Sequence, residues 1–152
     1  MITRVLVLLT GSWFLCTAAL AQPANTQPAP APADDTTARL MATISNWAGA
    51  WQSQLPDLYI AHYALDYKAD GFATREAWVA DRRERLRIPA WIKLRLIDFE
   101  LVSITETEAV TRFTLIYERP DYQDQTYKEL VLHNRNGLWL ISAETNLEVT
   151  AL

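Results

Sequence analysis

The chain has 152 residues, of which 50% are hydrophobic and 21% charged, and its formal net charge is −4. This length and balance are typical of one folded domain with a sizeable core. The acidic excess argues against a nucleic-acid partner and against anionic membrane surfaces, because both are bound by clustered Lys and Arg.

The first 21 residues have the organisation of a secretory signal peptide. Arg4 supplies a positive charge, an apolar run follows it, and Ala-Leu-Ala precedes Gln22 as a small-residue cleavage site. We expect cleavage after Ala21, export to the periplasm or the medium, and no stable membrane insertion of the cleaved chain. The alternative is a retained anchor, although the apolar run is shorter than the ~20 residues of a membrane span. Cleavage also removes Cys16, the single cysteine.

Residues 22–37 are rich in Pro and Ala and are predicted to be an extended tether, since proline disfavours helix and favours polyproline conformations. The folded domain is then expected over residues 38–152, with its first helix beginning near Thr36.

Helical patterns occupy the first half of this domain. Residues 36–54 predict a first helix whose apolar face is formed by Leu40, Ile44, Trp47, Ala48 and Trp51. Pro56 suits the first turn of a short second helix over 56–65. Thr74 is expected to cap a third helix, which Pro89 ends.

Strand patterns occupy the second half, over 91–104, 109–118, 126–134 and 138–149, with a polar loop expected over 119–128. The alternation in the first strand changes phase between Leu96 and Ile97, which predicts a β-bulge and a bend. Asn136-Gly137 predicts a tight hairpin before the last strand. The predicted fold class is α+β: a cone-shaped, curved antiparallel sheet of about four strands, with three N-terminal helices packed on its concave side.

Several segments together resemble one known family. They are "WAGAW" (47–51), "YIAHYALDY" (59–67), "RRERL" (82–86), "DYQD" (121–124), "KELVL" (128–132) and "GLWLI" (137–141). Over roughly 38–150 the chain resembles the nuclear-transport-factor-2-like (NTF2-like, or SnoaL-like) superfamily, and most closely the domain appended to exported L,D-transpeptidases of Gram-negative bacteria. The resemblance implies an open-mouthed cone that is often dimeric. Some members are isomerases, dehydratases or cyclases and many others only bind, so the fold implies a cavity but no particular reaction.

Arg82 lies between Trp78 and Leu86 on the apolar stripe of the third predicted helix. A buried guanidinium needs an anionic partner, because burial of an unpaired charge is costly. Asp66 and Asp98 are candidates in the sequence. Arg82 is interpreted either as half of a structural ion pair or as an anchor for a ligand carboxylate, which Arg grips through two hydrogen bonds.

Tyrosines recur along the second predicted helix and in the strands, and tyrosine suits both a cavity wall and a protein interface. The residues predicted to line a pocket are Arg82, Trp78, Tyr63, Tyr67, Tyr117, Tyr122 and Lys128. Asp121 and Asp124 fall short of the six or more oxygens that calcium takes, so turn chemistry explains them better. We expect no metal and no cofactor.

His62 and Asp66 are four residues apart and are expected on one face, where they form the alternative catalytic pair of a base and its orienting carboxylate. The commoner interpretation is a local surface pair. His133, beside the predicted hairpin, is expected to be solvated.

The predicted function is an exported, non-catalytic binding or accessory module that serves cell-envelope, peptidoglycan-related proteins. Its expected partners are an envelope protein or a small apolar or carboxylate ligand, and a homodimer through the open sheet face is a further possibility. The alternative function is a small cofactor-free isomerase or dehydratase that uses His62 and Asp66 in the cone.

Overall fold

A computed structural model describes residues 32–152 of the chain, and the predicted signal peptide over 1–21 lies outside the described residues. Three helices precede a four-stranded antiparallel sheet with strand order β1-β2-β3-β4. The helices are α1 (Pro32–Gln52), α2 (Pro56–Ala61) and α3 (Arg75–Arg85), and the strands are β1 (Lys93–Ile104), β2 (Glu108–Arg119), β3 (Tyr122–Arg135) and β4 (Leu138–Ala151). Within residues 32–152, none of the helices is both long and apolar enough to cross a membrane.

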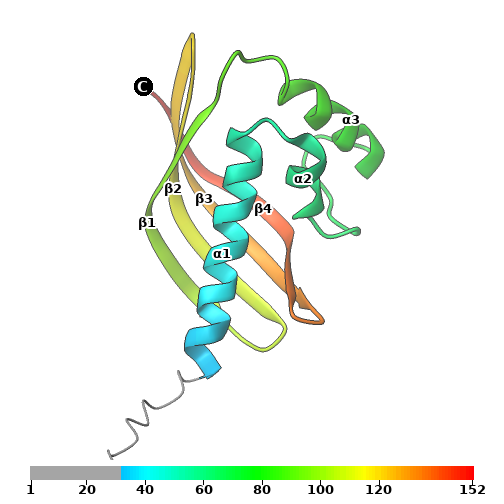
Figure 1. The fold of residues 1–152 in the computed structure, drawn as a ribbon, viewed down its shortest axis with the longest axis vertical. Coiled ribbons are helices and arrows are strands. Elements are labelled where there is room, and N and C mark those ends of the chain that lie inside the picture. The colour runs from blue at the N-terminus through cyan, green and yellow to red at the C-terminus, as the bar shows by residue number, and fades with distance from the viewer. Residues whose placement is uncertain (1–31) are drawn as a thin grey trace, which may run out of the picture.

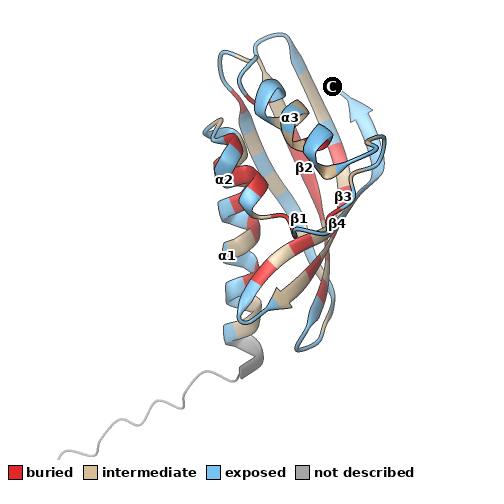
Figure 2. Ribbon diagram, turned by 90° about the vertical axis from the view of Figure 1, so that its right-hand side faces the viewer, coloured by how far each residue is buried: buried red, intermediate tan, exposed pale blue. Residues whose placement is uncertain are grey.

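The sheet is curved, and α1 lies across it while α2 and α3 gather toward one end (Figure 1). This is the predicted α+β architecture. Its core lies between the sheet and α1, where both elements carry fully buried side chains, as the burial colours of Figure 2 also indicate. The largest fully buried side chains of the sheet and α1 are Trp47, Trp139, Phe113, Leu40, Leu115, Leu130, Leu132 and Ile141, and α3 adds Trp78.

Two helices differ in extent from the prediction. Helix α1 begins at Pro32, inside the segment expected to be extended, because a proline in the first turn lacks only an N–H that has no helical partner there. Helix α2 ends at Ala61 rather than near residue 65. From His62 onward the backbone leaves the helix to pair with β4, where Tyr63 forms a bridge to Ile141. Helix α3 is capped as predicted, with the Ala77 N–H donating to Thr74 Oγ1 at 3.2 Å.

The bulge predicted in the first strand is confirmed. The register of β1 against β2 shifts between Ile97 and Glu100, and Asp98 between them has a φ of +54°. The hairpin at Asn136-Gly137 is confirmed too, since both residues have positive φ and the flanking Arg135 and Leu138 pair directly.

The loop predicted over 119–128 is wrong. Strand β2 continues to Arg119 and β3 starts at Tyr122, so that only two residues turn the chain. Direct pairing of Tyr117 with Asp124 and of Arg119 with Tyr122 shows why: the polar segment supplies ladder partners for β2 despite its composition. The long β2–β3 hairpin forms the end of the sheet nearest α3 (Figure 1).

Substitution of Asp98 tests the bulge. Asp98 is exposed and in the left-handed region, so a change there reports on the backbone rather than on packing. Asp98→Val is expected to lower the free energy of unfolding by about 1–2 kcal/mol, the cost of a left-handed conformation for a residue with a Cβ branch. Asp98→Gly is expected to leave it unchanged or slightly raised. Urea unfolding measures both, and equal effects of the two variants would contradict the bulge geometry.

Candidate functional site

A cavity of about 510 Å³ opens between the helices and the end of the sheet near the β2–β3 hairpin. Its wall combines aromatic and apolar side chains with charged ones. The aromatic and aliphatic members are Trp51, Tyr59, Leu86, Ile88, Ile92, Leu115, Tyr117 and Tyr122. The charged members are Arg82, Arg85, Arg119, Lys128, Asp124 and Glu144. The fold therefore contains the predicted cavity, and its lining is amphipathic.

A buried ion pair lies in this wall. The Lys128 ammonium donates to Glu144 Oε1 and also to Asn146 Oδ1 at 2.7 Å. Only 4% of the Lys128 side chain and 16% of the Glu144 side chain are exposed. Lys128 comes from β3 and its two acceptors from β4, so the pair joins neighbouring strands on the face that the helices cover.

The second carboxylate oxygen of Glu144 connects the ion pair to the helices. Tyr63 donates its hydroxyl proton to Glu144 Oε2 at 2.6 Å. The Tyr63 oxygen in turn accepts the Trp47 indole N–H at 3.0 Å. Tyr59 lies 2.6 Å from the same oxygen and must be the donor, because the single Tyr63 proton is already committed to the carboxylate. One continuous network thus runs from α1 to β4.

The charges in the network settle its protonation state. Burial on its own would raise the pKa of Glu144, but the Lys128 ammonium, the Tyr63 hydrogen bond and the Arg82 charge together hold that pKa below its ordinary value. Burial, with the nearby Glu144 charge, raises the pKa values of Tyr59 and Tyr63. At neutral pH the carboxylate is therefore ionised while both phenols stay protonated.

Main-chain hydrogen bonds place Tyr63 beside Glu144. The Ala64 N–H donates to the Ile141 carbonyl, and the Ile141 N–H donates to the His62 carbonyl, both at 2.8 Å. These two bonds clamp the exit of α2 onto the middle of β4, three residues before Glu144.

An aromatic wall continues from Tyr59 of the network along the cavity. The ring of Trp51 lies 5.7 Å from those of Tyr59 and Tyr117, and the Tyr117 ring lies 6.2 Å from that of Tyr122. Helix α1, helix α2 and the β2–β3 hairpin each contribute to this wall. Such rings offer a ligand a flat apolar surface with hydroxyls at its edge.

Of the predicted pocket residues, four line the cavity: Arg82, Tyr117, Tyr122 and Lys128. The other three lie behind it in the core. Tyr63, Tyr67 and Trp78 are 7% exposed or less, and the rings of the two tyrosines lie 4.8 Å and 5.0 Å from that of Trp78. They support the wall rather than form it.

The ion-pair partner of Arg82 is not one of the two expected carboxylates. Arg82 Nη1 lies 3.5 Å from Asp81 Oδ2, on the preceding residue. Asp98 is held in the exposed bulge of β1, and Asp66 pairs with Arg135 at 3.4 Å. Neither carboxylate forms an ion pair with Arg82.

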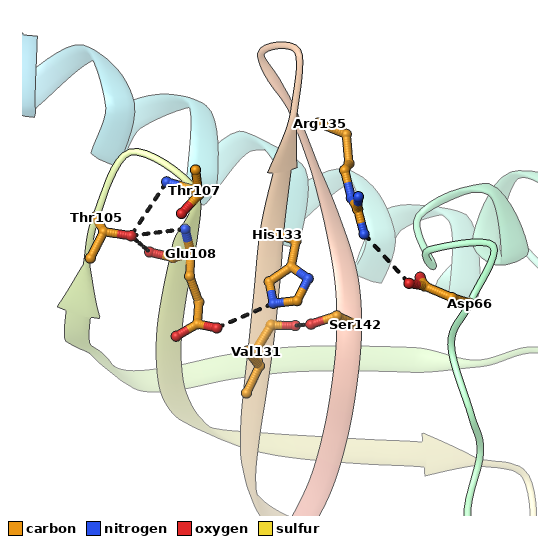
Figure 3. Close-up of polar contacts among 8 residues, drawn as sticks. All are labelled: Asp66, Thr105, Thr107, Glu108, Val131, His133, Arg135 and Ser142. Carbon is orange, nitrogen blue, oxygen red and sulfur yellow. Dashed lines mark hydrogen bonds and ion pairs between the residues drawn. The ribbon is translucent and has the colours of Figure 1, made fainter.

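His62 and Asp66 are not brought together, and neither lines the cavity. His62 Nδ1 donates to the Leu58 carbonyl at 2.8 Å, while Asp66 reaches across to Arg135 at the β3–β4 hairpin (Figure 3). Helix α2 ends at Ala61, before both residues, so the four-residue spacing does not put them on one helix face. His133 contacts Glu108 at 3.2 Å near the same hairpin, also outside the cavity (Figure 3).

The polar residues of the cavity that sequence reasoning did not assign to a pocket include Glu144, Asn146 and Arg119. Plain alternation from the buried Trp139 and Ile141 would put residues 143 and 145, not Glu144 and Asn146, on the covered face. A bulge at Ser142 shifts the register against β3 and brings Glu144 and Asn146 to that face instead, so the spacing held no signal for them. Arg119 was assigned to a loop.

The family model of the Cds6 C-terminal NTF2-like domain matches residues 39–145. The chain belongs to this family. No curated protein sequence matches it.

Solved structures with the same fold are similar over three quarters of the chain. Bd1075 of Bdellovibrio bacteriovorus superposes with a TM-score of 0.67 at 20% identity, covering 74% of this chain and 40% of that one. Pgp2 of Campylobacter jejuni, a helical cell shape determining protein, gives 0.61 at 20% identity, covering 73% and 41%. A putative scytalone dehydratase from Novosphingobium aromaticivorans gives 0.62 at 13% identity, covering 78% and 91%. The chain thus spans about two fifths of the length of Bd1075 and Pgp2.

Removal of the buried cation is expected to destabilise the fold strongly. Lys128→Met leaves the Glu144 carboxylate buried without its counter-charge, at a cost of about 3–5 kcal/mol in the free energy of unfolding. Lys128→Met combined with Glu144→Gln should recover part of this loss, because no uncompensated charge then remains. Arg112→Met, which breaks the more exposed Arg112–Glu129 pair on the sheet, is the matched control and should have a much smaller effect. Denaturant unfolding measures all three, and equal effects of Lys128→Met and the control would contradict the buried pair.

The lowered pKa of Glu144 predicts acid sensitivity. Because the pKa is lower in the folded than in the unfolded chain, the group stabilises the fold above its ordinary value of 4.5, and this contribution is lost as pH falls through the folded pKa. The wild type should therefore lose more stability than Glu144→Gln when pH is lowered from about 5 to about 3. Thermal unfolding across this range checks the difference, and parallel pH profiles would contradict it.

Proposed function

We propose that this chain is an exported, non-catalytic module that binds a component of the cell envelope in its cavity, in the service of peptidoglycan-related proteins. The observation that carries the proposal is the closed hydrogen-bond network of Glu144. Both carboxylate oxygens and the Lys128 ammonium are committed to partners inside the protein. What remains open to a ligand is the aromatic wall and the arginines.

The same network argues for binding over catalysis. A general base works best with a pKa near the working pH and a free lone pair aimed at the substrate. The pKa of Glu144 is lowered and its oxygens are occupied, while raised pKa values keep the phenols of Tyr59 and Tyr63 protonated. The dehydratase alternative depended on His62 and Asp66, which lie apart from each other and outside the cavity lining.

The envelope part of the proposal is supported by the similar structures. Pgp2 is a helical cell shape determining protein, and bacterial shape depends on the cell wall. The signal-peptide pattern of residues 1–21 agrees with a place outside the cytoplasm. A wall fragment offers sugar faces and short peptides, which suit a cavity lined by Trp and Tyr.

Co-sedimentation with purified peptidoglycan tests the proposal, with two tryptophan variants as a matched pair. Trp51 stacks in the cavity wall, whereas Trp91 is 40% exposed and lies outside the lining. Trp51→Ala is expected to raise the Kd about tenfold, as loss of an aromatic anchor does, while Trp91→Ala leaves it unchanged. Circular dichroism verifies that both variants fold. Equal retention of wild type and both variants, or no retention of the wild type, would overturn the proposed function.

A separate experiment tests the proposal that the module is not an enzyme. Soluble peptidoglycan fragments incubated with the wild-type chain should keep their masses, and a fragment whose mass changes only in the presence of the protein would show that the module is an enzyme.

A further inference from the structure

We infer that the cavity binds the carboxylate group of an otherwise apolar ligand through the guanidinium groups of Arg82 and Arg119. The inference rests on the proposed function in treating the cavity as a binding site, and it adds the chemical class of the ligand.

The two arginines differ from Arg83 and Arg112 in how their charge is satisfied. Arg83 and Arg112 make short Nε contacts with carboxylates, at 2.9 Å and 2.8 Å. Arg82 and Arg119 have only long contacts, 3.5 Å to Asp81 and 3.6 Å to Asp121. Their Nε atoms are also buried without a hydrogen-bond partner, and no other arginine among residues 35–152 shares this condition. The buried Nε atoms show that the protein leaves the two guanidinium groups incompletely satisfied. Because 30% of the Arg82 side chain and 36% of the Arg119 side chain are exposed, a ligand oxygen can approach both groups from the cavity.

Both arginines line one cavity although they come from distant parts of the chain. Arg82 is in the last turn of α3, and Arg119 ends β2. Arg119 has its guanidinium carbon 5.2 Å from the centre of the Tyr122 ring, a stacking that orients the planar group. The cavity therefore has two cationic groups with unused donors on separate elements.

The other charged groups of the lining limit the anion to a single charge. Lys128 and Glu144 neutralise each other, and Arg85 donates to Asp81 at 2.8 Å. Asp124 stays in the lining as a negative charge that opposes a dianion. A carboxylate matches the arginine fork and brings one charge, whereas a phosphate monoester brings close to two.

The remainder of the ligand meets an apolar wall. Trp51, Leu115 and Tyr117 lie in the same lining as the arginines. A volume of about 510 Å³ accommodates a molecule of small-drug size. The ligand class is thus an amphipathic monocarboxylate, such as a short peptide end or an aryl acid.

Three probes with a phenylalkyl body test the inference on the full chain: 4-phenylbutyrate, its carboxamide, and 3-phenylpropyl phosphate. Binding is followed by NMR through the indole N–H signal of Trp51. The acid is expected to bind at least tenfold more tightly than the amide and more tightly than the phosphate. Equal affinity for acid and amide, tighter binding of the phosphate, or no binding of the acid would each overturn the inference.

Arginine variants assign the effect to the two side chains. Arg82→Gln and Arg119→Gln should each raise the Kd for the acid at least fivefold and leave the Kd for the amide unchanged. Arg83→Gln, on the same helix as Arg82 but outside the lining, is the matched control and should change neither. Equal weakening of acid and amide would mean that the arginines only support the wall, and would overturn their assigned role. Arg82→Lys and Arg119→Lys keep the charge without the fork and should lie between wild type and the Gln variants.

The two proposals fail separately. Retention on peptidoglycan with no preference for the acid would leave the proposed function standing without the carboxylate site. Preference for the acid with no retention would leave a carboxylate-binding cavity whose ligand comes from elsewhere.

Discussion

The arrangement of the buried polar side chains beside the cavity depends on the ion pair between Lys128 and Glu144. A lysine that is 4% exposed is tolerable only because a carboxylate and an amide oxygen meet its protons. The carboxylate in turn fixes the proton of Tyr63, and Tyr63 fixes the donors from Trp47 and Tyr59. One charged contact between two strands therefore orders side chains on two helices.

Most of the fold was predictable because its elements follow local rules. Helical periodicity located α1 and α3, a side-chain cap located the start of α3, and Asn136-Gly137 located the last hairpin. Even the bulge near Asp98 was visible as a change of phase. These features depend on residues close together in sequence, which is why one sequence sufficed.

The errors lie where long-range pairing overrides local composition. Helix α2 stops early because the backbone after Ala61 bonds to Ile141, eighty residues later. The polar segment after Arg119 forms a strand because its backbone pairs residue by residue with β2. In the site, Arg82 could be singled out from helical spacing, but Glu144 could not, because the bulge at Ser142 moves it to the covered face. His62 and Asp66 had the right spacing on a helix that does not reach them.

The backbone bonds that hold the α2 exit against Ile141 have a consequence for how this domain can change over time. Because main-chain atoms make them, replacement of the side chains at these positions does not by itself remove the donors and acceptors. Residues that touch a bound molecule can therefore be exchanged while the frame that carries them persists. This agrees with the fold that the chain shares with Bd1075, Pgp2 and the putative scytalone dehydratase, although only 13–20% of the aligned residues are identical. It also makes this frame a suitable scaffold on which to install new binding specificities.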